Sequence, residues 1–147
     1  MPPRLASMAD LMDREVIHVH TGTGGNAGTQ TTAAIIRAIA LGEIGLRDGL
    51  RVLLHELRTG LLLGAAMAVV AFVRARTWGA TVPLSLSVGL SIMAIVVWAN
   101  TIGSVLPLVA ARLRIDPAVV SGPLMSTLVD ATGLFLYFII AGAVLGL

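Results

Sequence analysis

The sequence contains no cysteine and no lysine, and each absence excludes a class of site. Without cysteine, the chain can form neither disulfides nor thiolate metal sites. Without lysine, it cannot carry the P-loop lysine of a nucleotide-binding motif. Charged residues are also scarce, at 12% of 147 residues, against about 25% in an average soluble domain. The pI of about 10.4 reflects ten scattered arginines, and because the formal net charge is only +2, we expect no nucleic-acid partner.

Apolar residues are correspondingly abundant. They make up 56% of the chain, and the mean hydropathy is +0.93. A soluble core of this size cannot enclose that much apolar surface, so the sequence predicts an integral membrane protein. Because a membrane helix needs about 20 apolar residues, we expect an all-α, polytopic helical bundle with about four spans. These spans are predicted near residues 16–41, 57–78, 83–111 and 117–147, and the first is the most polar.

Most of the arginines lie near the ends of these spans or outside them. Residues 1–20 predict a short amphipathic helix ahead of the first span. Residues 42–58 predict a loop with a short interfacial helix. Asp116 is predicted to cap a helix that has Pro117 at its first position. The loops at 42–58 and 112–116 together hold five arginines and the loop near 74–82 holds two, which predicts that the two richer loops are cytoplasmic.

The run TGTGGNAGTQTT, residues 21–32, combines glycines with hydrogen-bonding side chains. Part of it matches the dinucleotide-binding pattern G-x-G-x-x-G/A. That pattern has meaning only after a strand and before a helix, so a soluble nucleotide enzyme is the least favoured function. Gly24 and Gly28 form a G-x-x-x-G pair, which predicts close packing of membrane helices.

Polar side chains within the spans are the candidates for function. Asn26, Gln30 and Arg37 fall within about 40° of one another on a helix, and packing alone does not require such a polar stripe. Asn100 lies in the third predicted span, where an amide is costly to bury. Both features favour a path for a polar solute over a purely structural bundle.

Asp130 is the only charged residue of the last predicted span, with 13 uncharged residues before it and 17 after. A carboxylate at the bilayer centre costs several kcal/mol on insertion scales (~2.5–3.5) and usually faces an interior or a water path. Ser126 and Thr127 lie one turn before it on the same helix face. Two interpretations stay open: an ion or proton site, and a protonated aspartic acid bonded to a neighbouring helix. One carboxylate with hydroxyl and amide neighbours suits hydrated Mg²⁺, and a homodimer would bring two such carboxylates to its two-fold axis.

Three segments together resemble the membrane domain of MgtE-type magnesium channels: GTGGNAGTQ, RAIALGEI and IDPAVVSGPLMSTLVDATGLFLYF. The resemblance covers about residues 22–147. It implies a homodimer in the inner cell membrane, with five membrane helices per subunit, a pore along the dimer axis, and Mg²⁺ as the transported and pore-bound ion. The implied metal ligand is Asp130. The candidate pore-lining residues are Gly25, Asn26, Thr29, Gln30, Asn100, Gly122, Ser126 and Thr127.

The chain also departs from the pattern of that family. Residues 21–147 correspond to the membrane domain without its first helix, and residues 1–20 are not expected to be native family sequence. No segment corresponds to the family's cytoplasmic regulatory domains. We therefore expect a fragment, a mis-called gene start or half of a split protein. The leading hypothesis is a channel or transporter for magnesium or other divalent cations, and not an enzyme. The alternative is a non-conducting accessory subunit that needs a partner chain to supply the missing helix and regulatory domains.

Overall fold

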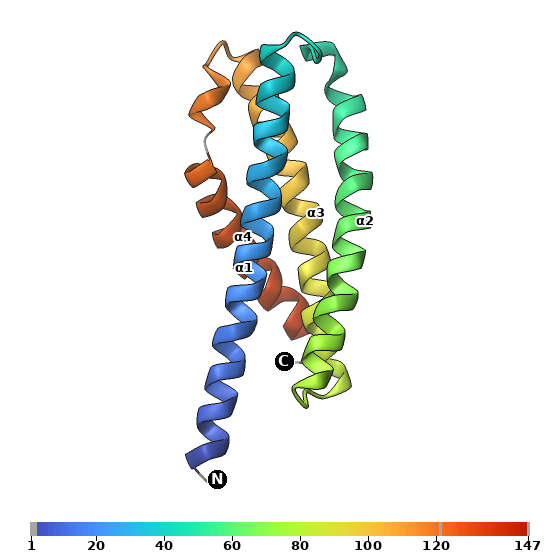
Figure 1. Ribbon diagram of the computed structural model, residues 1–147, viewed down its shortest axis with the longest axis vertical. Helices are drawn as coiled ribbons and strands as arrows, with labels where there is room; N and C mark the ends of the chain where they lie inside the picture. Colours follow the sequence, from blue (N-terminus) through green and yellow to red (C-terminus); the bar gives the residue numbers. More distant parts are fainter. Residues whose placement is uncertain (1–2, 121, 147) are drawn as a thin grey trace.

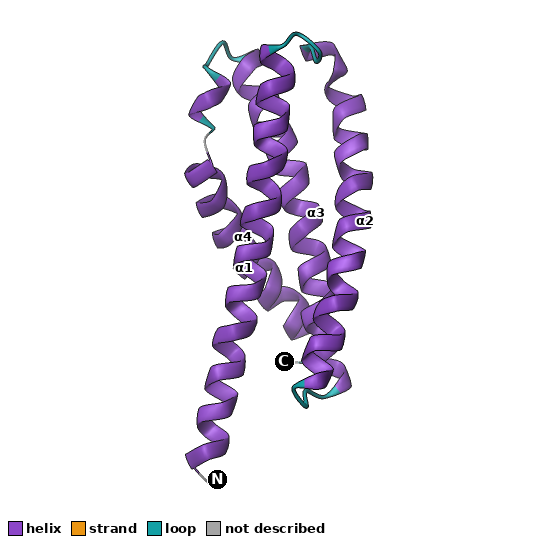
Figure 2. Ribbon diagram, viewed as in Figure 1, coloured by secondary structure: helices purple, strands orange, loops and turns teal. Residues whose placement is uncertain are grey.

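The computed structural model describes the backbone of residues 3–120 and 122–146, and the side chains from residue 22 onward within these ranges. Nearly all of this part is helical, and it contains no strand (Figure 2). The four α-helices are α1 (Pro3–Ala40), α2 (Gly49–Thr77), α3 (Val82–Arg112) and α4 (Gly122–Leu145). Two short 3₁₀ turns, Leu46–Asp48 and Pro117–Val119, precede α2 and α4.

Helix α3 is the centre of the bundle. It packs against each of the other three helices, and α1 also packs against α4. The α1–α2 and α3–α4 connections lie at one end of the molecule, and the α2–α3 turn and the C-terminus lie toward the other (Figure 1). The amino-terminal end of α1 extends beyond that second end (Figure 1). The two arginine-rich loops thus share one end, as the alternation of spans predicts.

The core lies on the two sides of α3. On one side, Ala71 of α2 packs with Ile92 and Val96. On the other, Met125 and Val129 of α4 pack with Ile95 and Ala99. The outer surface carries many exposed large apolar side chains, of which Leu62 on α2, 76% exposed, is the most open. An apolar exterior around a packed core suits a protein whose surroundings are lipid.

Three helices among the described residues are long and apolar enough to cross a membrane. They are Leu46–Thr77, which includes α2, then α3 and α4. The prediction of a helical membrane bundle is confirmed, and the third predicted span, 83–111, agrees closely with α3. Helix α1 does not meet the same criterion, because the polar run at residues 21–32 lowers its hydropathy.

Three predicted boundaries differ from the structure. Residues 49–58 are not a separate interfacial helix, because α2 continues unbroken from Gly49. The charges that indicated a loop lie along a continuous helix. Asp116 does accept a hydrogen bond from the Ala118 amide, at 2.9 Å, but the helix it caps is the short 3₁₀ turn, and α4 begins at Gly122. The backbone of residues 3–20 is helical, as predicted, and runs into residues 21–40 without a break.

Glycines allow the backbones of α1 and α3 to come into direct contact. A Cβ atom on Gly103 would lie 2.7 Å from the Gly28 carbonyl oxygen, closer than real Cβ contacts. Pro107, four residues after Gly103, has no N–H to donate to the Gly103 carbonyl. Instead the Thr32 hydroxyl of α1 donates to that carbonyl, at 3.2 Å. The close packing predicted from Gly24 and Gly28 is therefore confirmed, within a single chain.

Candidate cation site between α1 and α4

The Asp130 side chain lies on the face of α4 that meets α1. It is half-buried, and its Oδ1 atom is fully buried with no hydrogen-bond partner among the described residues. A Cβ atom on Gly25 would lie 3.2 Å from this oxygen. The lack of a side chain at Gly25 thus gives the carboxylate its place against α1. A buried carboxylate oxygen without a donor is costly, which makes this oxygen a candidate ligand for a cation.

Small and hydroxyl-bearing residues surround this carboxylate. The Thr29 and Ser126 hydroxyls lie 3.3 Å apart, joining α1 to α4. Gly122 lies one turn before Ser126, and its Cβ position would be 3.1 Å from the Thr29 methyl group. We call Gly25, Thr29, Gly122, Ser126 and Asp130 the α1–α4 seam. The seam brings together five of the nine predicted site residues.

Two further predicted residues lie on the open side of α1. Asn26 and Gln30 are exposed, as is Arg37 of the same predicted stripe. Asn26 follows Gly25 directly and lies about 60° around the helix from Thr29. On α4, Thr127 is also exposed, and its hydroxyl donates to the Pro123 carbonyl of its own helix, at 2.9 Å. The seam is therefore flanked by polar side chains that no neighbouring helix of this chain covers.

Asn100 lies elsewhere, in the packed interior of the bundle. It is 2% exposed, and its Oδ1 accepts a hydrogen bond from Thr31 of α1, at 3.3 Å. Gly60 of α2 is close to its other side, with a Cβ position 3.4 Å from the Asn100 amide nitrogen. Asn100 thus joins α1, α2 and α3, and its pore-lining role stays a prediction. Thr31 was not singled out from the sequence, because a partner 69 positions away leaves no local signal.

The side-chain atoms of the seam that could bind a metal ion are oxygen atoms. The described residues contain no group of three or more His, Cys, Asp or Glu side chains that could hold a metal ion. The described part of the chain therefore contains no metal site built from several such side chains. Carboxylate and hydroxyl oxygens suit hard cations, and Mg²⁺ in particular keeps several of its waters when bound.

The sequence also matches a known protein family. Residues 17–140 match the MgtE family, described as a divalent cation transporter. The chain belongs to this family. Among its relatives, the magnesium transporter MgtE of Thermus thermophilus is 44% identical over 125 residues, and that of Enterococcus faecalis is 37% identical over 125 residues. The magnesium transporter MgtE of Bacillus subtilis is 32% identical over 123 residues.

These alignments cover 84–85% of the chain but only 27–28% of the length of the relatives. The chain thus spans little more than a quarter of each curated MgtE protein that it matches. Members of the MgtE family are transporters and not enzymes. The matched region contains every residue of the α1–α4 seam as well as Asn26 and Gln30. Together with the three apolar helices, the match identifies a multi-pass membrane protein.

Proposed function

We propose that this chain forms the ion-conducting part of a magnesium transporter in the inner cell membrane. Two copies meet so that their α1 and α4 helices line a central pore, and Asp130 from each copy holds a hydrated cation. The observation that carries this proposal is the Asp130 carboxylate, whose buried Oδ1 has no donor among the described residues. The waters of a hydrated Mg²⁺ ion are hydrogen-bond donors, and the ion itself balances the charge.

The open face of α1 supports a pore beside this carboxylate. Exposed Asn26 and Gln30 belong to a helix of a membrane bundle. In lipid, their amides would lack hydrogen-bond partners, at a cost of several kcal/mol for each unsatisfied group (~2–7). A water-filled path satisfies these groups. A second copy across a two-fold axis closes the path and supplies a second carboxylate. The named function of the relatives, magnesium transport, supports Mg²⁺ as the transported ion.

The test is Mg²⁺ uptake by the chain in liposomes, compared between the parent and Asp130→Asn. Asparagine keeps the shape of the side chain and removes its charge from both copies. We expect uptake to fall at least ~10-fold, because a loss of only ~1.4 kcal/mol in ion stabilisation is a factor of ten. The free energy of unfolding should hold or rise, since an amide is cheaper to bury than a carboxylate.

Asp116→Asn is the matched control, because it makes the same chemical change in the α3–α4 loop and asparagine can still cap the 3₁₀ turn. Its uptake should equal that of the parent. Asp130→Glu should give an intermediate loss, since the longer side chain narrows the room for the ion's water shell. Parental uptake in Asp130→Asn would show that Asp130 is only structural. If the parent chain itself gives no uptake above empty liposomes, the accessory-subunit hypothesis replaces this one.

A further inference from the structure

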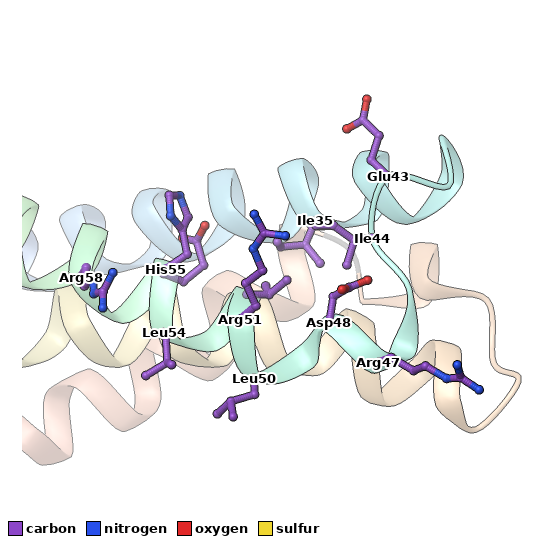
Figure 3. Close-up of a pocket in the computed structure, with 12 residues that line it drawn as sticks. Ile35, Glu43, Ile44, Arg47, Asp48, Leu50, Arg51, Leu54, His55 and Arg58 are labelled. Atoms are coloured by element: carbon purple, nitrogen blue, oxygen red, sulfur yellow. The ribbon is translucent and has the colours of Figure 1, made fainter.

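An open pocket of about 810 Å³ lies where the α1–α2 connection meets the first turns of α2. Ile35 of α1 and Ile44 of the connection contribute apolar surface, and residues 47–58 contribute most of the remainder (Figure 3). This pocket is formed by α1 and α2, whereas the cation site lies between α1 and α4. The proposed transport function therefore does not account for it.

Two stripes run along the 3₁₀ turn Leu46–Asp48 and the first half of α2. The basic stripe is Arg47, Arg51, His55 and Arg58, and all four residues line the pocket. The leucine stripe is Leu46, Leu50, Leu54 and Leu61, which are 54%, 70%, 46% and 42% exposed. Figure 3 shows Arg51 and His55 on one side of the helix and Leu50 and Leu54 on the other. The segment thus presents basic side chains on one face and exposed leucines on a face about 100° around the same helix.

The arginines of the basic stripe have no counter-ion among the residues whose side chains the structure describes. Within the described part of the chain, none of them forms an ion pair, although three acidic residues also line the pocket. The Asp48 carboxylate accepts a hydrogen bond from the Gly45 amide, at 2.9 Å. The Glu43 carboxylate points away from the arginines (Figure 3), and Glu56 pairs with none of them. The basic stripe is therefore free to bind an external anion.

The position of Arg58 sets the depth of this site. It immediately precedes the uncharged stretch 59–73, which has 15 residues and is about 23 Å long as a helix. Arg58 therefore lies close to the edge of the hydrocarbon layer, and Arg51 about 10 Å further out, at headgroup level. This end holds the two arginine-rich loops, which places it on the cytoplasmic side. Anionic lipids are abundant in that leaflet.

We propose that the basic stripe and the leucine stripe together bind an anionic phospholipid. Its phosphodiester group lies between Arg51 and Arg58 beside His55, and its acyl chains lie along the leucine stripe. A soluble phosphate would satisfy the arginines but would leave the exposed leucines uncovered. The juxtaposition of the two stripes on one helix therefore favours a lipid over a free anion.

Native mass spectrometry of the chain tests this proposal, after release from micelles that contain equal amounts of phosphatidylglycerol and phosphatidylcholine. We expect the parent to retain the anionic lipid preferentially. Arg51→Gln/Arg58→Gln should lower that preference by about 25-fold, or about fivefold for each arginine. Arg74→Gln/Arg76→Gln is the matched control, because it removes the same charge at the opposite end of α2, and it should keep the preference. Equal preference in both double variants would overturn the proposal.

Three further measurements separate the roles of the leucine stripe and of the arginine charges and identify the bound ligand. Leu50→Ser/Leu54→Ser should lower retention of both lipids without changing their ratio, and unchanged retention would remove the role of the leucine stripe. Arg51→Lys/Arg58→Lys keeps the charge, so it should keep most of the preference even if the glutamine variant folds poorly.

Added inorganic phosphate should not displace the bound lipid. Displacement by phosphate, with no lipid preference in the parent, would identify a soluble anion as the occupant and would refute the lipid site.

Discussion

Gly25 controls how closely α1 can approach Asp130 of α4, the residue proposed to hold the cation. A methyl group at this position would lie 3.2 Å from Asp130 Oδ1 and 3.6 Å from the Ser126 hydroxyl. The first of these distances is tighter than most Cβ contacts, so the carboxylate would have to move by a few tenths of an ångström. Gly22, one turn earlier, has no atom within 4 Å of its Cβ position. The two glycines of one helix therefore offer a matched comparison.

We expect Gly25→Ala to reduce Mg²⁺ uptake several-fold, because the added methyl group displaces the Asp130 carboxylate. Gly22→Ala should leave uptake unchanged and raise the free energy of unfolding by about 0.5–1 kcal/mol, the usual gain of alanine over glycine within a helix. Uptake in liposomes and thermal unfolding in detergent measure the two effects. Equal uptake in both variants would mean that the carboxylate position beside Gly25 is unimportant for transport.

At the scale of helices, Asn100 links α3 to α1 through its hydrogen bond with Thr31. Thr31 is the residue that donates to Asn100, and Thr29, two positions earlier, faces Ser126 across the seam. A change at Asn100 should therefore be felt at the seam, although Asn100 does not contact it in this structure. This effect can be measured without any transport assay, because the chain contains no cysteine and a cysteine pair at positions 29 and 126 reports the α1–α4 distance.

In that cysteine-pair background, Asn100→Leu should slow disulfide formation between positions 29 and 126 several-fold. It should also lower the free energy of unfolding by about 1 kcal/mol, because the half-buried Thr31 hydroxyl loses its acceptor. Adding Thr31→Val should restore most of both losses, since replacing both partners by apolar groups is nearly neutral. Failure of the second substitution to restore the rate would show that Asn100 acts through something other than its bond with Thr31.

The elements differ in how well the sequence predicts them, for physical reasons. Helix α3 follows from a long uncharged run, since only a buried or membrane helix has that composition. The start of α2 was misplaced because charges normally indicate solvent, whereas here one face of the helix carries arginines and the next carries leucines. Asp130 was identifiable because one charge in an apolar span is rare. The interior position of Asn100 was not, because its partner comes from a distant part of the chain.

For the whole molecule, the proposed dimer makes a geometric prediction. Identical residues near a two-fold axis lie close to their own copies. Asn26→Cys should therefore cross-link two chains in the membrane, because Asn26 lies on the polar face proposed to line the pore. Leu62→Cys, at a highly exposed position on α2, should not. Gel electrophoresis under non-reducing conditions measures both. Cross-linking at position 62 with none at position 26 would show that the two chains meet at α2, and it would refute the proposed interface of α1 and α4.

The contact between Pro107, Gly103 and Thr32 has a consequence for how this protein can evolve. Pro107 leaves the Gly103 carbonyl without its usual helical donor, and Thr32 of another helix supplies one. Losing the threonine alone leaves the Gly103 carbonyl without a donor, whereas losing the proline alone restores the helical N–H, and the carbonyl can accept from both groups through its two lone pairs. The order of substitution therefore matters. A mutational path that replaces the proline first keeps this carbonyl paired at every step, and one that replaces the threonine first does not.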